Sequence, residues 1–169
     1  STFPSQILGG PTFAQTRIAT SPVMSSGDDL DVLVCFNSEA YDNHSQELAE
    51  DGVVIYNSEN FDLGEEIRSI GIPFSELAKS TGNARAGNMV VLGAFAQLIN
   101  MPQDYLIDFV TQRFTRGRPG DDQIVRSNIE AIGLGFIKAK ERGFNLGELA
   151  DPIVAEGEQI LIKGNQAIA

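Results

Sequence analysis

The chain has 169 residues, 42% of them hydrophobic, which is enough to bury the core of one domain. Twelve basic against 23 acidic residues give a formal net charge of −11, which argues against nucleic acid or an anionic membrane as the main partner. With one cysteine, and with no segment that reads as a signal peptide or a membrane span, the sequence indicates a cytoplasmic protein.

The first part of the chain predicts a loop followed by a short strand. Gly9-Gly10-Pro11 closes a segment of mixed polar and apolar residues and is typical of a loop or a tight turn. Residues 12–18 alternate loosely between apolar and polar side chains. This alternation predicts a strand in which Arg17 faces outward.

Two parallel strands joined by a helix are predicted next. Residues 31–36 and 53–56 are continuous apolar runs of strand length, which is typical of parallel strands covered on both faces. Residues 39–49 predict a helix between them, with Asn37 and the serine after it as candidates for its cap. Gly52 is expected to end this helix.

Cysteine and histidine, two residues that often carry catalysis, occur once each. Cys35 lies inside an apolar run, where a small buried thiol is expected. His44 lies on the apolar stripe of the predicted helix and is expected to be a partly buried structural residue. No catalytic triad and no cluster with metal-ligand spacing can be assembled from the sequence.

An acidic loop, a third strand and a short helix follow. Residues 57–66 predict a loop whose carboxylates face solvent. Residues 67–72 predict a strand that Pro73 closes, and residues 75–79 predict a short helix.

The next stretch combines a polar turn with a buried helix. Residues 89–99 contain one polar side chain, Gln97, and predict a helix that is apolar on every face and too short to cross a bilayer. The turn before it delivers asparagines and an arginine to the helix N-terminus, where free N–H groups favour an anion. Either Asn83 or Asn88 merely caps the helix while Arg85 faces solvent, or the turn binds a ligand.

From Pro102 onward the pattern predicts helices only. Apolar stripes mark two amphipathic helices, one through Leu106, Phe109, Val110 and Phe114, the other through Val125, Ile129, Ile132 and Phe136.

Between these helices, Arg113, Arg116 and Arg118 form a local basic patch in an otherwise acidic chain. The patch could meet a phosphate, or it could be a solvent-exposed helix end. The sequence leaves both interpretations open.

The end of the chain predicts a linker and the start of another unit. Residues 144–158 are punctuated by Asp151-Pro152 and Gly157, and no long apolar stripe survives there. Residues 159–163 are strand-like, and Gly164 to Ala169 reads as the first turn of a helix.

Several of these stretches follow one another in the order of a known family. They are Thr2-Phe3-Pro4 with Gly9-Gly10-Pro11 and Gln15-Thr16-Arg17-Ile18, then Asp31-Val32-Leu33-Val34 with Asn37-Ser38-Glu39-Ala40-Tyr41, and then Asn83 to Gly93. Together they resemble the γ-type domain of the 2-oxoacid:ferredoxin oxidoreductases. Gly164 to Ala169 is similar to the opening of the family's α-type, pyrimidine-binding domain, which points to the 2-oxoglutarate-type α subunits.

The resemblance implies an α/β fold, with a Rossmann-like, mostly parallel sheet flanked by helices and a helical C-terminal part. It divides the chain into a γ-type domain at residues 1–143, a linker at 144–158 and the start of an α-type domain at 159–169. The family's first strand, turn and helix have no counterpart in this sequence. The chain is therefore expected to be a fragment whose sheet has an unpaired inner edge.

The resemblance also implies a division of labour within an oligomeric complex of α-type and β-type domains or subunits. The family oxidises 2-oxoacids to acyl-coenzyme A and passes electrons to ferredoxin, using thiamine diphosphate, magnesium, iron–sulfur clusters and coenzyme A. The best guess for the substrate is 2-oxoglutarate, followed by pyruvate. The γ-type domain covers the active site and holds no catalytic residue or metal ligand, so the isolated chain is expected to be inactive.

Coenzyme A is the one ligand that the resemblance brings to this domain. The expected contacts are Gly9, Gly10, Asn83, Arg85 and Asn88. The residue before Gly9-Gly10 is often arginine in the family and is leucine here, which weakens the case for that loop. The alternative is a non-catalytic Rossmann-like binding or interaction module.

Overall fold

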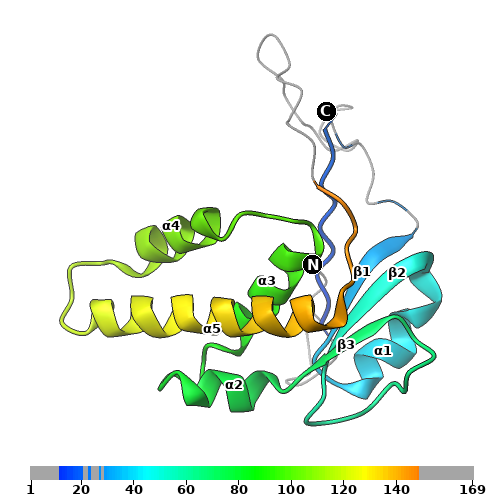
Figure 1. The fold of residues 1–169 in the computed structure, drawn as a ribbon, viewed down its shortest axis with the longest axis horizontal. Helices are drawn as coiled ribbons and strands as arrows, with labels where there is room; N and C mark the ends of the chain where they lie inside the picture. Colours follow the sequence, from blue (N-terminus) through cyan, green and yellow to red (C-terminus); the bar gives the residue numbers. More distant parts are fainter. Residues whose placement is uncertain (1–11, 21–22, 24–26, 28, 149–169) are drawn as a thin grey trace, which may run out of the picture.

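The computed structural model describes residues 12–20, 23, 27 and 29–148. Figure 1 shows the strands gathered at one side of the molecule with α1 beside them, while α5 crosses in front of α3. The elements are β1 (Leu30–Cys35), α1 (Ser38–His44), the 3-10 helix η1 (Ser45–Glu47), β2 (Leu48–Asn57), β3 (Ser69–Ile72), α2 (Phe74–Ser80), α3 (Gly87–Leu98), α4 (Gln103–Phe114) and α5 (Asp121–Arg142). The predicted α/β, Rossmann-like architecture is confirmed.

The sheet has the order β1-β2-β3, and both pairs are parallel. Cys35 lies opposite Tyr56, and Tyr56 lies opposite Gly71, so the three strands share one register. Among the described strands, none pairs with the outer edge of β1. The apolar runs predicted as strands therefore do form a parallel sheet.

The helix predicted for residues 39–49 is shorter than expected. It ends at His44, η1 follows, and β2 already begins at Leu48. Leu48 pairs with Leu30 and packs beside the buried side chains of β1. Pairing with β1 therefore makes Leu48 and the residues after it a strand, although their local pattern predicts a helix.

The strand predicted for residues 12–18 is wrong. These residues are irregular and exposed, with 51% of Phe13 and 53% of Ile18 accessible to solvent. Their alternation is weak, and no described strand forms a hydrogen-bonded ladder with them. Without a ladder, local alternation alone does not make a strand.

Successive residues of β2 face two different cores, as the alternation of side chains along a strand requires. Val53 and Ile55 pack toward α2, α3 and α5, whereas Val54 and Tyr56 pack toward α1 and the loop after β2. A third cluster joins α3, α4 and α5 through Ala96, Leu106, Val110 and Ile132. This third cluster confirms most of the inward positions predicted for the two amphipathic helices, but Phe109 is wrong as a member of the buried stripe, since 52% of it is exposed. No helix in the described part of the chain has the length and apolar character needed to span a bilayer.

Helices α3 and α5 touch through their backbones. A methyl group added to Gly93 would overlap the carbonyl oxygen of Ile132, and one added to Gly135 would overlap the carbonyl oxygen of Val90. These two glycines therefore have no room for a side chain. They allow the two helices to approach more closely than any other residue type would.

After α5 the chain returns to the sheet. Phe144 and Leu146 pack on the main core, and the N–H of Leu146 donates to the carbonyl oxygen of Leu98 at 2.8 Å. The first residues of the predicted linker are thus attached to the domain. The rest of that linker and the predicted start of an α-type domain lie outside the described residues, so both stay predictions.

The glycine contact generates a test of stability. Gly135→Ala should lower the free energy of unfolding by about 1–3 kcal/mol or more, because the methyl group must push α3 and α5 apart. Urea-induced unfolding of the whole chain, followed by circular dichroism, measures the change.

Gly133→Ala is the matched control, since no heavy atom lies within 4 Å of its added methyl group. This change should stabilise the protein by about 0.5–1 kcal/mol through helix propensity alone. Equal effects of the two substitutions would contradict the proposed backbone contact.

Candidate functional site

The polar turn before α3 lies at the carboxyl edge of the sheet. Helix α2 starts directly after β3, and the N–H of Phe74 donates to Asn57 Oδ1 at the end of β2. The Cα of Gly87, the first residue of α3, lies against Phe74, since an added methyl group would stand 3.7 Å from the carbonyl oxygen of that residue. Ligands of open parallel sheets bind at this edge, so the turn is well placed for binding.

Helix α2 starts against a carboxylate from the preceding loop. Glu59 Oε2 accepts from the N–H of Ser75 at 2.8 Å, and Glu59 Oε1 accepts from the N–H of Glu76 at 3.0 Å. The Ser75 N–H holds the pKa of Glu59 below its ordinary value of 4.5. The α2 terminus therefore already has its anion.

The acidic loop is more ordered than the sequence predicts. Its carboxylates are exposed as expected, but Asp62 also accepts from the Tyr56 hydroxyl at 2.9 Å and from the N–H of Gly64 at 3.1 Å. Glu59 serves α2 from 16 residues away. The sequence does contain one indication that a distant residue caps α2. Its N-cap residue, Pro73, has no side-chain acceptor, whereas the first N–H groups of a helix need one.

Asn83 ties the turn to α5 instead of capping α3. Its Nδ2 donates to Ser127 Oγ at 3.3 Å and to Asn128 Oδ1 at 3.4 Å, while its Oδ1 accepts from the N–H of Arg85 at 3.1 Å. The N-cap residue of α3 is Ala86, and no side chain caps that helix. The capping interpretation of the asparagines is therefore wrong, because the Asn83 side chain is engaged by the turn and by α5.

The α3 terminus remains open toward solvent. Within the described residues, no acceptor receives the N–H groups of Gly87 and Asn88, whereas the next two N–H groups bond to the carbonyl oxygen of Ala86. The side chains of Arg85 and Asn88 are exposed beside this terminus. Two free N–H groups, a guanidinium and an amide form a donor set suited to an anionic oxygen.

The body of α3 is less enclosed than its sequence predicts. Val90, Ala94 and Leu98 are fully buried, but Phe95 remains half-buried on a face that no helix covers. The side-chain oxygen of Gln97 is buried without a described hydrogen-bond partner. The side of α3 with Phe95 therefore borders a cavity, while Val90, Ala94 and Leu98 lie in the core.

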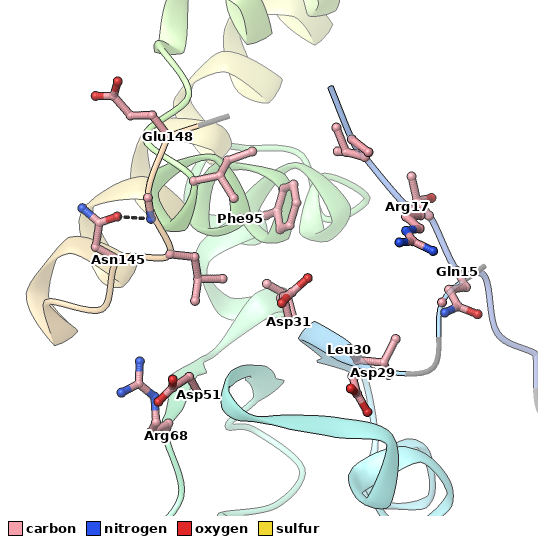
Figure 2. A pocket seen from close by; sticks show the side chains of 18 residues that line it. Gln15, Arg17, Asp29, Leu30, Asp31, Asp51, Arg68, Phe95, Asn145 and Glu148 are labelled. Atoms are coloured by element: carbon pink, nitrogen blue, oxygen red, sulfur yellow. Dashed lines mark hydrogen bonds between the residues drawn. The ribbon is translucent and has the colours of Figure 1, made fainter. Parts of the chain in front are cut away.

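Figure 2 shows this cavity, which has a volume of about 900 Å³ and lies at the opposite end of α3 from the polar turn. Asp29, Asp31 and Asp51 line it from the starts of β1 and β2, and Glu148 projects away from its rim. Arg68 stands with its guanidinium carbon 5.2 Å from the centre of the Phe144 ring. With four carboxylates against two arginines in its lining, this cavity disfavours a phosphate.

The candidate reactive groups are structural. Cys35 is fully buried, and burial raises the pKa of its thiol to about 11, so it carries no thiolate at neutral pH. His44 Nδ1 lies 2.9 Å from Glu47 Oε1, and its ring packs on Phe13. In the described part of the chain, no three His, Cys, Asp or Glu side chains gather in a way that could hold a metal ion.

Two of the five predicted site residues, Gly9 and Gly10, lie outside the described residues. The other three, Asn83, Arg85 and Asn88, are brought together by the turn. Asn83 is the positioning member, because its hydrogen bonds fix the turn, and the other two face solvent.

Comparison with known proteins gives a consistent result. The family model described as pyruvate ferredoxin/flavodoxin oxidoreductase matches residues 1–137. Ketoisovalerate oxidoreductase subunit VorA of Methanothermobacter marburgensis is 33% identical over 112 residues, which are 64% of this chain and 23% of the relative. 2-Oxoglutarate oxidoreductase subunit KorA of Mycobacterium tuberculosis is 25% identical and covers 98% of this chain and 29% of its own. The chain thus spans about a quarter of the length of these relatives.

Two solved structures are similar as well. The 2-oxoglutarate:ferredoxin oxidoreductase from Magnetococcus marinus, with 2-oxoglutarate, coenzyme A and succinyl-CoA bound, matches with a TM-score of 0.66 and 27% identity. The match covers 79% of this chain and 24% of that one. The γ subunit of a keto/oxoacid ferredoxin oxidoreductase from Geobacter sulfurreducens matches with a TM-score of 0.55 and 26% identity, over 66% of this chain and 64% of that one.

The cap on α2 generates a pH-dependent prediction. Because the pKa of Glu59 is lower in the folded than in the unfolded chain, its stabilisation is complete above pH 4.5 and is lost as the pH falls through the folded-state pKa. Glu59→Ala should therefore cost roughly 0.5–1 kcal/mol of unfolding free energy at pH 7, with less difference from wild type at pH 3.

Glu65→Ala removes a neighbouring exposed carboxylate that makes no hydrogen bond to any other described residue, and it should leave stability unchanged at both pH values. Thermal unfolding of the three proteins at pH 7 and pH 3 makes the comparison. A pH-independent loss for Glu59→Ala would show that its carboxylate does not cap α2.

Proposed function

Since the chain belongs to the pyruvate ferredoxin/flavodoxin oxidoreductase family and forms its γ-type domain, we propose that it works within a complex that oxidises a 2-oxoacid to acyl-coenzyme A and reduces ferredoxin. The observation that carries this proposal is the match of the family model over residues 1–137. In this assignment the domain joins α-type and β-type domains or subunits in an oligomeric, cytoplasmic enzyme.

2-Oxoglutarate is the proposed substrate. The KorA relative covers 98% of this chain. The Magnetococcus marinus structure, to which this chain is similar, holds 2-oxoglutarate. A second candidate is ketoisovalerate, favoured by the 33% identity to VorA. Pyruvate, which the family description names, is the third.

The redox and decarboxylation chemistry is assigned to other parts of the complex. An iron–sulfur cluster needs about four thiolates, whereas this chain has one cysteine, which is buried and protonated. The described carboxylates do not gather as the magnesium of a thiamine diphosphate site requires. The described residues therefore do not fit an iron–sulfur cluster or the magnesium of a thiamine diphosphate site.

Coenzyme A, by contrast, fits the donors of the polar turn. Its phosphates are anions, and the N–H groups of Gly87 and Asn88 point out of the α3 terminus next to the exposed Arg85 guanidinium. Asn83 holds the turn on α5, so these donors are fixed before the ligand arrives. Gly9 and Gly10 remain proposed contacts from the N-terminal loop.

The role of this arrangement is binding and positioning. Arg85 pairs with a phosphate, and the helix start adds two directional N–H donors. If the polar turn holds the phosphate-bearing nucleotide end of coenzyme A, the thiol end of coenzyme A is free to reach an acyl group made by the neighbouring domains. The alternative, a binding module without part in turnover, uses the same turn and differs only in the activity of the assembly.

The activity test uses the complete complex purified with all its subunits. It should reduce methyl viologen when given 2-oxoglutarate and coenzyme A, more slowly with ketoisovalerate or pyruvate, and not at all without coenzyme A. A complex that oxidises none of the three 2-oxoacids would leave the binding-module alternative.

Arg85→Ala in that complex should raise the KM for coenzyme A roughly ten- to hundredfold, since a charge-assisted contact contributes about 1.5–3 kcal/mol. The KM for the 2-oxoacid should not change. Lys140→Ala, which removes an exposed cation from the C-terminal end of α5, serves as control. An unchanged KM for coenzyme A in the Arg85 variant would refute the phosphate contact.

A further inference from the structure

The loop between α4 and α5 is built to present arginines. Asp121 Oδ2 accepts from the N–H of Arg116 at 2.6 Å and from the N–H of Arg118 at 3.0 Å. Only 8% of Asp121 is exposed, so its carboxylate fixes the loop from inside, and Gly117 and Gly120 take the positive φ angles that the tight path requires. The loop is therefore held by its backbone while the two arginine side chains extend into solvent.

Four arginines lie on the elements that meet at this end of the molecule. Arg113 lies on the last turn of α4, Arg116 and Arg118 lie on the loop, and Arg126 lies on α5, and all four are exposed. We name these four residues the arginine tip. The whole chain has 12 basic residues against 23 acidic ones, so a third of its basic residues lie in the tip.

The arginines of the tip make no ion pair within the described part of the chain. No carboxylate there lies within ion-pair distance of any of the four guanidinium groups. The Asp121 carboxylate attracts Arg116 and Arg118 but accepts hydrogen bonds from their backbone N–H groups. Asp122 and Glu130 lie one helical turn from Arg126. The exposed guanidinium groups are thus available to carboxylates of an outside partner. The structure places Arg113, Arg116 and Arg118 in solvent, which agrees with the exposed helix end, one of the two interpretations that the sequence leaves open.

Aromatic side chains extend the same surface. Tyr105 and Phe109 are spaced four residues apart on α4, are 68% and 52% exposed, and continue in line to Arg113. The opposite face of α4 packs inward through Leu106 and Val110, so the exposed stripe is not needed for the core. Exposed aromatic residues beside arginines are the composition enriched in protein interfaces.

The position of the tip suits a contact between proteins. Figure 1 shows the connection between α4 and α5 at the end of the molecule that lies farthest from the sheet. None of the four arginines lines the cavities of about 900 and 810 Å³. A projecting, charged surface with apolar neighbours meets another surface more readily than it encloses a small ligand.

We propose that the arginine tip, with Tyr105 and Phe109, docks onto a carboxylate-rich surface of another subunit of the same oxidoreductase. The nature of the partner rests on the proposed function, whereas the surface rests on the geometry above. The arginines speed and orient the encounter, and the two aromatic side chains become buried in the contact.

The test compares two charge reversals of equal size in the assembled complex. Arg116→Glu/Arg118→Glu should weaken association with the other subunits at least tenfold in 50 mM NaCl and should flatten the salt dependence of the dissociation constant. Lys79→Glu/Lys140→Glu, at exposed positions elsewhere, should change it less than twofold. Association is measured by sedimentation velocity at 50 and 500 mM NaCl.

Further measurements separate the outcomes. Circular dichroism melting checks that the variants fold, and Arg116→Lys/Arg118→Lys should restore most of the association. Equal weakening by both reversals, or none by either, would overturn the proposed surface, as would tip-dependent binding to phosphatidylserine vesicles in place of subunit association. 2-Oxoacid-dependent viologen reduction by the wild-type complex tests the proposed function separately.

Discussion

The contact between the backbones of α3 and α5 is the constraint on which the rest of the molecule depends. Gly93 and Gly135 let each helix lie against a carbonyl group of the other, and any side chain at either position would force them apart. This close approach places Ser127 and Asn128 within hydrogen-bonding distance of Asn83. The geometry of the polar turn is therefore a consequence of helix packing, and it would loosen with that packing.

The carboxyl edge of the sheet shows how one fold treats two helix termini differently. The start of α2 is filled by the Glu59 carboxylate, so its N–H groups are satisfied from within the chain. The start of α3 lacks such an acceptor and has Arg85 and Asn88 beside it. Buried N–H groups require a hydrogen-bond partner within the protein. N–H groups that face solvent can bond to water and exchange it for a ligand. The N-terminus of α2 is thus capped within the chain, whereas the N-terminus of α3 is open to a ligand.

Electrostatics separates the two ends of α3 further. A helix of 12 residues is roughly 18 Å long, and it has acidic side chains around the cavity at its C-terminal end and an arginine at its N-terminal end. A phosphate is therefore favoured at the turn and disfavoured in the larger cavity. The single thiol lies inside the sheet, where burial raises its pKa to about 11 and keeps it protonated.

The sequence by itself determined the parallel strands at 31–36 and 53–56, the helix after the polar turn, the burial of Cys35 and the family. Each of these is expressed in local composition, in the period of the apolar residues or in motif order. Only the tertiary structure decided that β2 begins at Leu48, that residues 12–18 form no strand, and that Asn83 reaches α5 instead of capping α3. These features depend on hydrogen bonds between residues far apart in the chain, about which a local pattern carries no information because the partner is chosen by packing.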